Sequence, residues 1–354
     1  MNILDDVKEM QLLDKSNVYN SIVNLPKQCL HAYSDVTANK DFKRQSGLKN
    51  VIMSGMGGSG LAARVIKPLF IDRTKCPIEL INSYHLPFYV DKDSLILVSS
   101  YSGNTEETLN TAYEALKRRA EIFSICSGGK LYDWSKKNSI PVYKIDPKYN
   151  ACGQPRIAIG YSIFGQMTML AKAGIVELPK NKVSAIAQFL STTGSNYEKE
   201  LNTKQNPAKQ MAISFFQSTP VLVGSNLIEG ALHVTKNQLN ENAKTFATSF
   251  LIPELNHHLM EGLQFPDSNK QNLKFLFYES DLNQPSIQKR FKLTKEVVKK
   301  NNINCLSFKL RAKDKLTQAF EAIQFGAFWQ YYLTMLYGID PAPIPWVNYF
   351  KKHL

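Results

Sequence analysis

The stretch LILVSSYSGNTEET, residues Leu95–Thr108, combines a strand, a turn and the start of a helix. Its first four residues form an apolar run that is typical of a strand buried on both faces. The hydroxyl-rich turn that follows contains Gly103, which allows the backbone to fold tightly. From Glu106 onward the sequence predicts a helix with acidic residues in its first turn and basic residues in its last, the order that the helix dipole favours.

The local chemistry of this stretch allows two interpretations. Serine, asparagine and threonine are common at helix N-termini, so an ordinary strand-to-helix turn explains the pattern. Alternatively, backbone N–H groups and several hydroxyls converge at the positive end of the helix and bind an anion. Because the turn lacks the lysine of a P-loop, a phosphomonoester suits it better than a nucleoside triphosphate with Mg²⁺.

A second glycine-rich turn precedes this one in the chain. The sequence predicts a strand at Asn50–Ser54, the turn GMGGSG at Gly55–Gly60, and a helix at Leu61–Phe70. Further short strands are predicted at residues 78–81, 122–126 and 142–145, and a buried helix at 157–173. Alternating strands and helices predict an α/β fold with a parallel sheet, which binds ligands at the C-terminal ends of its strands. Both turns lie at that edge, which favours the anion-binding interpretation.

The second half of the chain repeats this plan. A strand at Val221–Val223, a Gly-Ser-Asn turn and a helix at about 227–244 precede an expected loop at Thr245–Pro253. Two more strands are predicted at 273–278 and 303–310, and a long apolar helix at 314–337. The repetition suggests an internal duplication, with a domain at residues 1–175, a linker around Pro179 and a second domain at 185–354.

The composition is that of a soluble globular protein. Hydrophobic residues make up 44% of the 354 residues, charged residues make up 21%, and no apolar run is long enough to span a membrane. The start of the chain does not have the layout of a signal peptide. The five cysteines are scattered and form no CxxC pair, which argues for reduced thiols in a cytoplasm and against a disulfide framework or structural zinc.

The net charge of +13 raises the question of an acidic partner. The lysines are spread along the chain, and the densest cluster, between Lys289 and Lys300, falls on a predicted helix that also contains Glu296. Such a run is usually a solvated helix face rather than a nucleic-acid surface. A positive field also attracts a small anionic metabolite, so we expect an anionic substrate and neither a nucleic-acid nor a membrane partner.

Several polar residues outside the two turns are candidates for chemistry. Arg156 lies in a loop after the first set of strands. It is either a surface arginine or a residue whose guanidinium binds two anionic oxygens in a fixed geometry. Glu241 lies near the C-terminal end of a helix, where the dipole disfavours an acid, and is either a solvated side chain or a functional one. His257 and His258 follow Glu254 in an irregular segment, but their spacing is not that of a metal site.

Several short motifs occur together and in one order along the chain. They are GMGGSG (55–60), SYSGNTEET (100–108), PR (155–156), NENAK (240–244), PELNH (253–257), GIDPAP (338–343) and the terminal FKKHL. From about residue 45 to the end, the set resembles the bifunctional phosphoglucose/phosphomannose isomerases of the sugar isomerase (SIS) superfamily. This resemblance implies two SIS domains, each a parallel sheet flanked by helices in a doubly wound, flavodoxin-like order, in a homodimer with shared active sites.

The resemblance also implies an activity and a set of site residues. The activity interconverts glucose 6-phosphate, and mannose 6-phosphate, with fructose 6-phosphate through a cis-enediol(ate), without a metal or other cofactor. The matching phosphate-binding residues are Gly58, Ser59, Ser100, Ser102 and Thr105. Glu241 would move the proton between C1 and C2, and Arg156 would stabilise the enediolate. His257, from the neighbouring subunit, and Lys351 would assist ring opening, which supplies the general acid that this chemistry needs.

Three details qualify the match with the family pattern. His258 stands where an amide is usual, and Ala342 lies in a DPxP turn where a hydroxyl is expected. The second departure bears on the balance between glucose and mannose substrates. Lys351 and Lys352 differ as candidates by a one-residue register in the terminal motif.

Two alternative functions compete with this one. The first is another SIS isomerase, acting on an amino sugar phosphate or a heptose phosphate. An amino sugar synthase needs a glutaminase domain with an N-terminal cysteine nucleophile, which this sequence does not contain. The second is a non-catalytic SIS module that senses a sugar phosphate, although such a sensor has no use for Glu241 and His257.

Overall fold

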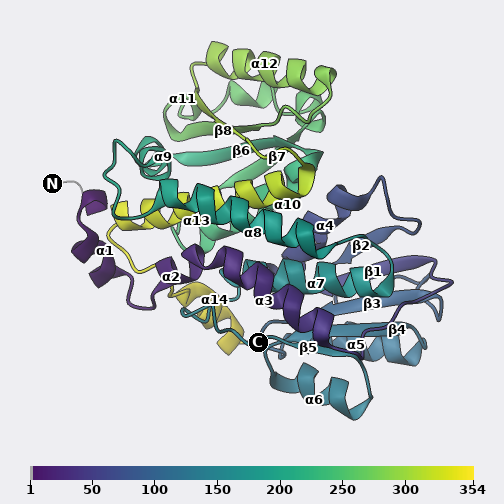
Figure 1. Cartoon of the computed structure of the whole chain (residues 1–354). Helices are drawn as coiled ribbons and strands as arrows, with labels where there is room; N and C mark the ends of the chain where they lie inside the picture. The colour runs from purple at the N-terminus through teal and green to yellow at the C-terminus, as the bar shows by residue number, and fades with distance from the viewer. Residues whose placement is uncertain (1–2) are drawn as a thin grey trace. The chain divides into compact units, whose positions relative to one another are not determined.

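The computed structural model describes residues 3–354 and contains two compact units (Figure 1). The N-terminal unit is continuous and comprises Val23–Gln188. The C-terminal unit combines Phe189–Leu354 with the described residues up to Ile22. The prediction placed the domains at 1–175 and 185–354, whereas these units meet between Gln188 and Phe189 and the described residues up to Ile22 pack with the second half of the chain.

A parallel sheet of five strands forms the centre of the N-terminal unit. The strands are β1 (Asn50–Gly55), β2 (Ile78–Ile81), β3 (Ser94–Ser99), β4 (Glu121–Cys126) and β5 (Val142–Lys144). Their order in the sheet is β2-β1-β3-β4-β5, which is the flavodoxin-like order of doubly wound folds. The predicted α/β class with a parallel sheet is confirmed.

Helices cover both faces of this sheet. On one face, α5 (Glu106–Lys117) and α6 (Gly129–Lys137) bury apolar side chains against alternate residues of the strands, among them Ile96 and Val98. On the other face lies α7 (Ile159–Ala173), whose Gln166 reaches Ser99. Two further helices, α3 (Leu25–Ala38) and α4 (Leu61–Phe70), pack against α7. Buried apolar residues on both sides explain why the strands read as continuous apolar runs.

The C-terminal unit contains a second parallel sheet with the same plan. Its strands are β6 (Thr219–Ser225), β7 (Thr248–Ile252), β8 (Leu273–Glu279) and β9 (Asn304–Lys309), in the order β7-β6-β8-β9. The prediction of a loop at 245–253 was wrong, because β7 pairs with β6 along this stretch. Four of the five residues of β7 are only partly buried, and its sequence, TSFLI, has an apolar run of only three residues and no alternation.

The remaining helices lie wholly or partly in the C-terminal unit. They are α1 (Val7–Leu13), α2 (Val18–Val23), α8 (Lys180–Gly194), α9 (Pro207–Phe215), α10 (Glu229–Glu241), α11 (Asn269–Asn272), α12 (Pro285–Lys300), α13 (Lys315–Leu336) and α14 (Pro345–Lys352). The apolar helix α13 is almost entirely buried and packs against α9 and α10. Among the described residues, no helix has both the length and the apolar character needed to cross a membrane.

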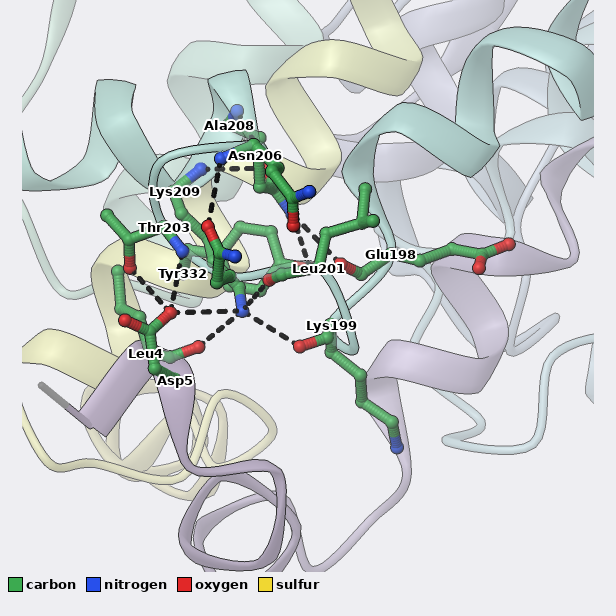
Figure 2. Close-up of polar contacts among 12 residues, drawn as sticks. Leu4, Asp5, Glu198, Lys199, Leu201, Thr203, Asn206, Ala208, Lys209 and Tyr332 are labelled. Atoms are coloured by element: carbon green, nitrogen blue, oxygen red, sulfur yellow. Dashed lines mark hydrogen bonds and ion pairs between the residues drawn. The ribbon is translucent and has the colours of Figure 1, made fainter.

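A buried lysine joins the first residues of the chain to the C-terminal unit (Figure 2). Lys209, on α9, is fully buried. Its ammonium donates hydrogen bonds to three backbone carbonyls, those of Leu4, Lys199 (2.8 Å) and Leu201 (2.6 Å). The carboxylate of Asp5 lies 3.9 Å from the ammonium and accepts from the Thr203 N–H at 2.6 Å. Burial lowers the pKa of Lys209 and Asp5 acts in the opposite direction, so the carbonyls and the carboxylate together stabilise the charged amine.

We predict that Lys209→Met lowers the free energy of unfolding of the C-terminal unit by about 3 kcal/mol, because three buried carbonyls lose their donor. Urea denaturation measures this loss, and limited proteolysis should release the residues before Ile22 earlier than in the wild type. Lys204→Met is the control, since Lys204 is exposed in the same loop and should change stability by at most about 0.5 kcal/mol. Equal effects of the two substitutions would contradict the prediction.

Candidate active site

The parallel pairing of β1 with β3 brings the two hydroxyl- and glycine-rich turns together. Gly55, at the end of β1, pairs in register with Ser99, at the end of β3. The chain leaves β1 through a short 3₁₀ turn, Gly57–Gly60, and leaves β3 through the turn Ser100–Thr105. The strand order reverses between β1 and β3, which is the position where doubly wound sheets bind their ligands.

The hydroxyl of Ser100 organises the turn after β3. Ser100 is buried, and its Oγ accepts from the N–H of Gly103 (3.1 Å) and lies 2.8 Å from Thr105 Oγ1. Ser102 is exposed, and its Oγ accepts from the N–H of Asn104 at 3.3 Å. Thr105 is the N-cap residue of α5, but its side chain makes no capping hydrogen bond. The first N–H groups of α5 therefore need another acceptor, and an anion can supply it.

Ser59 connects the two turns directly. Its Oγ accepts a hydrogen bond of 2.9 Å from the N–H of Tyr101. The Tyr101 hydroxyl accepts from Asn150 Nδ2 at 3.0 Å, and burial raises the pKa of Tyr101, which keeps the hydroxyl protonated at neutral pH. A small cavity lies at this edge of the sheet, lined by Gly58, Ser59, Ser99, Tyr101, Ile125, Ile145, Pro155 and Ser162.

A third turn, which follows β4, supports the turn after β3. Ser127 donates to the Tyr101 carbonyl through its N–H (2.8 Å) and its Oγ (2.7 Å), and the Leu131 N–H donates to the Gly103 carbonyl (2.9 Å). Gly103 has a φ of +71°, and a Cβ at this position would lie 1.9 Å from the carbonyl oxygen of Gly128. Glycine is therefore required here both for the backbone conformation and for the close approach.

Arg156 is buried beside the glycine-rich turn after β1. Its residue surface is 2% exposed, which excludes the interpretation of a surface arginine. A Cβ added to Gly58 would lie 3.4 Å from the Arg156 nitrogen, so the two backbones are in contact. The Arg156 guanidinium donates to Gln154 Oε1 at 2.7 Å through Nη1. Arg156 thus places a buried positive charge in the loop that contacts the turn after β1.

Glu241 is the last residue of α10 and is half-buried in the C-terminal unit. Lys244 folds back over this helix end, with Nζ donating to the carbonyls of Glu241 and Asn242 at 3.0 Å each. The same Nζ lies 3.4 Å from the carbonyl oxygens of Asp340 and Pro341. The NENAK and GIDPAP motifs, about a hundred residues apart in the sequence, are therefore neighbours in the structure.

The two adjacent histidines after β7 have different environments. His258 Nε2 lies 2.9 Å from Glu254 Oε2 and forms an ion pair when protonated. His257 is exposed at the end of a short 3₁₀ turn, Glu254–His257. Within residues 3–354, no three His, Cys, Asp or Glu side chains are grouped closely enough to hold a metal ion.

Lys351 lies on α14 near the end of the chain, and its side chain is exposed. This helix has no buried residue and also exposes aromatic side chains, with Trp346 82% and Phe350 63% accessible. The predicted site residues thus fall into two groups. The N-terminal unit holds Gly58, Ser59, Ser100, Ser102, Thr105 and Arg156, and the C-terminal unit holds Glu241, His257 and Lys351.

Comparisons with known proteins match both groups. Residues 46–137 match the SIS domain, and residues 204–354 match the bacterial phospho-glucose isomerase C-terminal SIS domain. A bifunctional phosphoglucose/phosphomannose isomerase of Caldicellulosiruptor bescii is 28% identical over 95% of this chain and 98% of its own length. The chain belongs to the phosphoglucose/phosphomannose isomerase family of SIS proteins. Its C-terminal SIS domain contains the candidate residues Glu241, His257 and Lys351.

Two more distantly similar proteins have other names. A D-glucosamine-6-phosphate 4-epimerase of Sulfolobus acidocaldarius is 27% identical over 65% of this chain and 68% of its own length. The crystal structure of tagatose-6-phosphate ketose/aldose isomerase from Escherichia coli superposes with a TM-score of 0.72 at 15% identity, covering 92% of this chain and 94% of that chain. The structural match concerns the fold alone, since the identity is low.

Sequence reasoning did not identify Gln166 or Ser162, which lie against the two turns from α7. Both are buried polar residues in a segment that is otherwise apolar. That contrast is the one feature of the sequence that could have marked them, because a buried amide needs specific partners.

We predict that Gly103→Ala lowers the free energy of unfolding by about 3 kcal/mol, the sum of a left-handed backbone penalty and a steric overlap. It should also abolish the binding of inorganic phosphate, measured by calorimetry, because the turn cannot close. Gly47→Ala is the matched control, with a φ of +72° and no atom within 4 Å of the added Cβ. If both variants lose the same stability, close packing at Gly103 is not required.

Proposed function

We propose that this protein is an aldose–ketose isomerase that interconverts glucose 6-phosphate, and also mannose 6-phosphate, with fructose 6-phosphate. The observation that carries the proposal is the pair of hydroxyl-bearing turns at the β1–β3 edge, with the buried Arg156 in the loop that contacts the first of them. Membership of a family of sugar-phosphate isomerases supports the same reaction class. The five free cysteines are consistent with a reducing cytoplasm.

In this proposal the N-terminal unit anchors the phosphate. The N–H groups at the start of α5, the hydroxyls of Ser102 and Thr105, and the backbone of Gly58 would contact the phosphate oxygens. Ser59 and Ser100 would also contact the phosphate, because each Oγ that accepts a backbone N–H group can still donate its own hydrogen to a phosphate oxygen. Arg156 would stabilise the negative oxygen that develops in the enediolate, where a fixed guanidinium is most effective.

The proton transfers are assigned to the C-terminal unit. Glu241 would remove the proton from C2 of the aldose and return it to C1, which requires a carboxylate and no metal. His257 and Lys351 would open the sugar ring by donating a proton to the ring oxygen. All three side chains are at least partly accessible, as groups that meet a substrate must be.

We further propose that the active form is a homodimer in which His257 acts in the site of the neighbouring subunit. The exposed position of His257 is compatible with this arrangement. The exposed aromatic side chains of α14, Trp346 and Phe350, form an apolar surface of the kind that a second copy covers.

A second candidate function is the epimerisation or isomerisation of an amino sugar phosphate. The similarity to a glucosamine-6-phosphate epimerase favours it over a substrate without phosphate. Such a reaction uses the same phosphate anchor, so the two candidates differ in the group at C2 of the sugar. A non-catalytic sugar-phosphate sensor would bind the same ligands without turnover.

We predict that the purified protein converts fructose 6-phosphate to glucose 6-phosphate, and that Glu241→Gln lowers turnover by a factor on the order of 10² to 10⁴ by removing the proton acceptor. A coupled dehydrogenase assay measures the rate, and calorimetry should give nearly unchanged phosphate affinity. Glu296→Gln, an exposed position on α12, is the control and should retain wild-type turnover.

The outcomes of this assay separate the candidates. Activity should survive exhaustive dialysis against EDTA, and a loss that zinc or manganese restores would contradict the metal-free mechanism. Full turnover in Glu241→Gln would make Glu241 a solvated helix-end residue, with Glu254 as the next candidate base. Turnover of glucosamine 6-phosphate alone would favour the second candidate, and binding without any turnover would favour a sensor.

Mixed dimers test whether the site is shared between subunits. Glu241→Gln and His257→Asn chains, each inactive alone, are unfolded together and refolded as a mixture. If the site is shared between subunits, one site of a mixed dimer contains both substitutions and the other contains neither. Half of the dimers are mixed and half of their sites are intact, so roughly a quarter of wild-type activity should return. No recovery, in a sample shown to contain mixed dimers, would place His257 and Glu241 in the same subunit.

A further inference from the structure

A buried glutamine on α7 contacts the turn after β1 and the last residue of β3, which leads into the second turn of the proposed phosphate site. Gln166 is 1% exposed. Its side-chain nitrogen lies 3.4 Å from the carbonyl oxygen of Ser59, 3.2 Å from Ser99 Oγ and 3.2 Å from Ser162 Oγ. One amide group therefore joins the turn after β1, the end of β3 and the helix that covers this face of the sheet.

The three partners of Gln166 share a second property. Ser59, Ser99 and Ser162 are among the eight residues that line the small cavity at this edge of the sheet. Gln166 itself is not among them. It therefore lies behind the wall of this cavity and holds that wall by hydrogen bonds.

The two turns are thus connected at two levels. In the cavity wall, Ser59 Oγ accepts from the N–H of Tyr101. Behind it, the Gln166 amide donates to the carbonyl of the same Ser59 and to the hydroxyl of Ser99, the residue before the second turn. The two N–H donors of the amide are shared among three acceptor oxygens, and they restrain the ends of β1 and β3 because buried hydrogen bonds tolerate little change in distance.

We propose that Gln166 is a positioning residue for phosphate binding, which sets the distance between the turn after β1 and the turn after β3. This inference rests on the proposed function of the two turns. Loss of the amide would let the turns separate and leave the Ser59 carbonyl without this donor. The phosphate contacts would then be imperfect in both the ground state and the transition state, which raises KM and leaves kcat almost unchanged.

Gln166→Met tests this role, since methionine fills a similar volume without donating a hydrogen bond. The KM for fructose 6-phosphate and the Kd for inorganic phosphate, measured by calorimetry, should each rise about tenfold, with kcat within about twofold of wild type. Gln324→Met is the matched control, because Gln324 is an equally buried glutamine of the C-terminal unit that bonds to the Leu190 carbonyl and to Thr193. It should lower thermal stability without changing either constant.

A second variant keeps the test decisive if Gln166→Met does not fold. Gln166→Glu can still accept hydrogen bonds from the hydroxyls of Ser99 and Ser162, but it opposes the Ser59 carbonyl and brings a negative charge behind the site. Its phosphate Kd should also rise by at least about tenfold. An unchanged Kd in either folded variant would overturn the role of Gln166, whereas a wild-type protein that binds phosphate without isomerising would overturn only the proposed function.

Discussion

Parallel pairing between β1 and β3 is the constraint on which the candidate site depends. The register that sets Gly55 beside Ser99 brings two turns together that are more than forty residues apart in the chain. Every further contact at this edge builds on that pairing, including the hydrogen bond from the Tyr101 N–H to Ser59 and the buried amide of Gln166. A parallel sheet needs helices on both faces. On one face, α5 begins at this edge with its N-terminus. On the other face, Gln166 of α7 bonds to the residues of the same edge.

The second sheet repeats the strand order but not the chemistry of its edge. β6 and β8 occupy the places of β1 and β3, yet β8 ends at Glu279 and is followed by Ser280 and Asp281 rather than by a run of neutral hydroxyls. The two carboxylates pair with Lys295 (2.6 Å) and Lys309 (3.0 Å). This edge therefore lacks the run of neutral hydroxyl donors found at the β1–β3 edge, and the duplicated fold carries different chemistry at its two sheets.

Local sequence predicted the strands that are buried on both faces, because an apolar run such as LILV indicates a buried strand without knowledge of the strands that pair with it. It missed β7, an edge strand whose identity depends on pairing with β6. The turns and their hydroxyls were also predictable, since clusters of glycine and serine after a strand are typical of turns. The burial of Arg156 and the contacts of Gln166 and Lys209 were not, because each depends on chain segments that are distant in sequence.

The contact between Lys209 and Leu4 joins residues 205 positions apart in the sequence. The order in which the chain is synthesised therefore affects when this contact can form. A ribosome releases the chain from its N-terminus, so the continuous unit Val23–Gln188 can fold as soon as it has emerged. The described residues before Ile22 are synthesised before α9, and they meet their partner only after α9 and the rest of the C-terminal unit have followed. During that interval this segment is not yet packed and is accessible to proteases and chaperones.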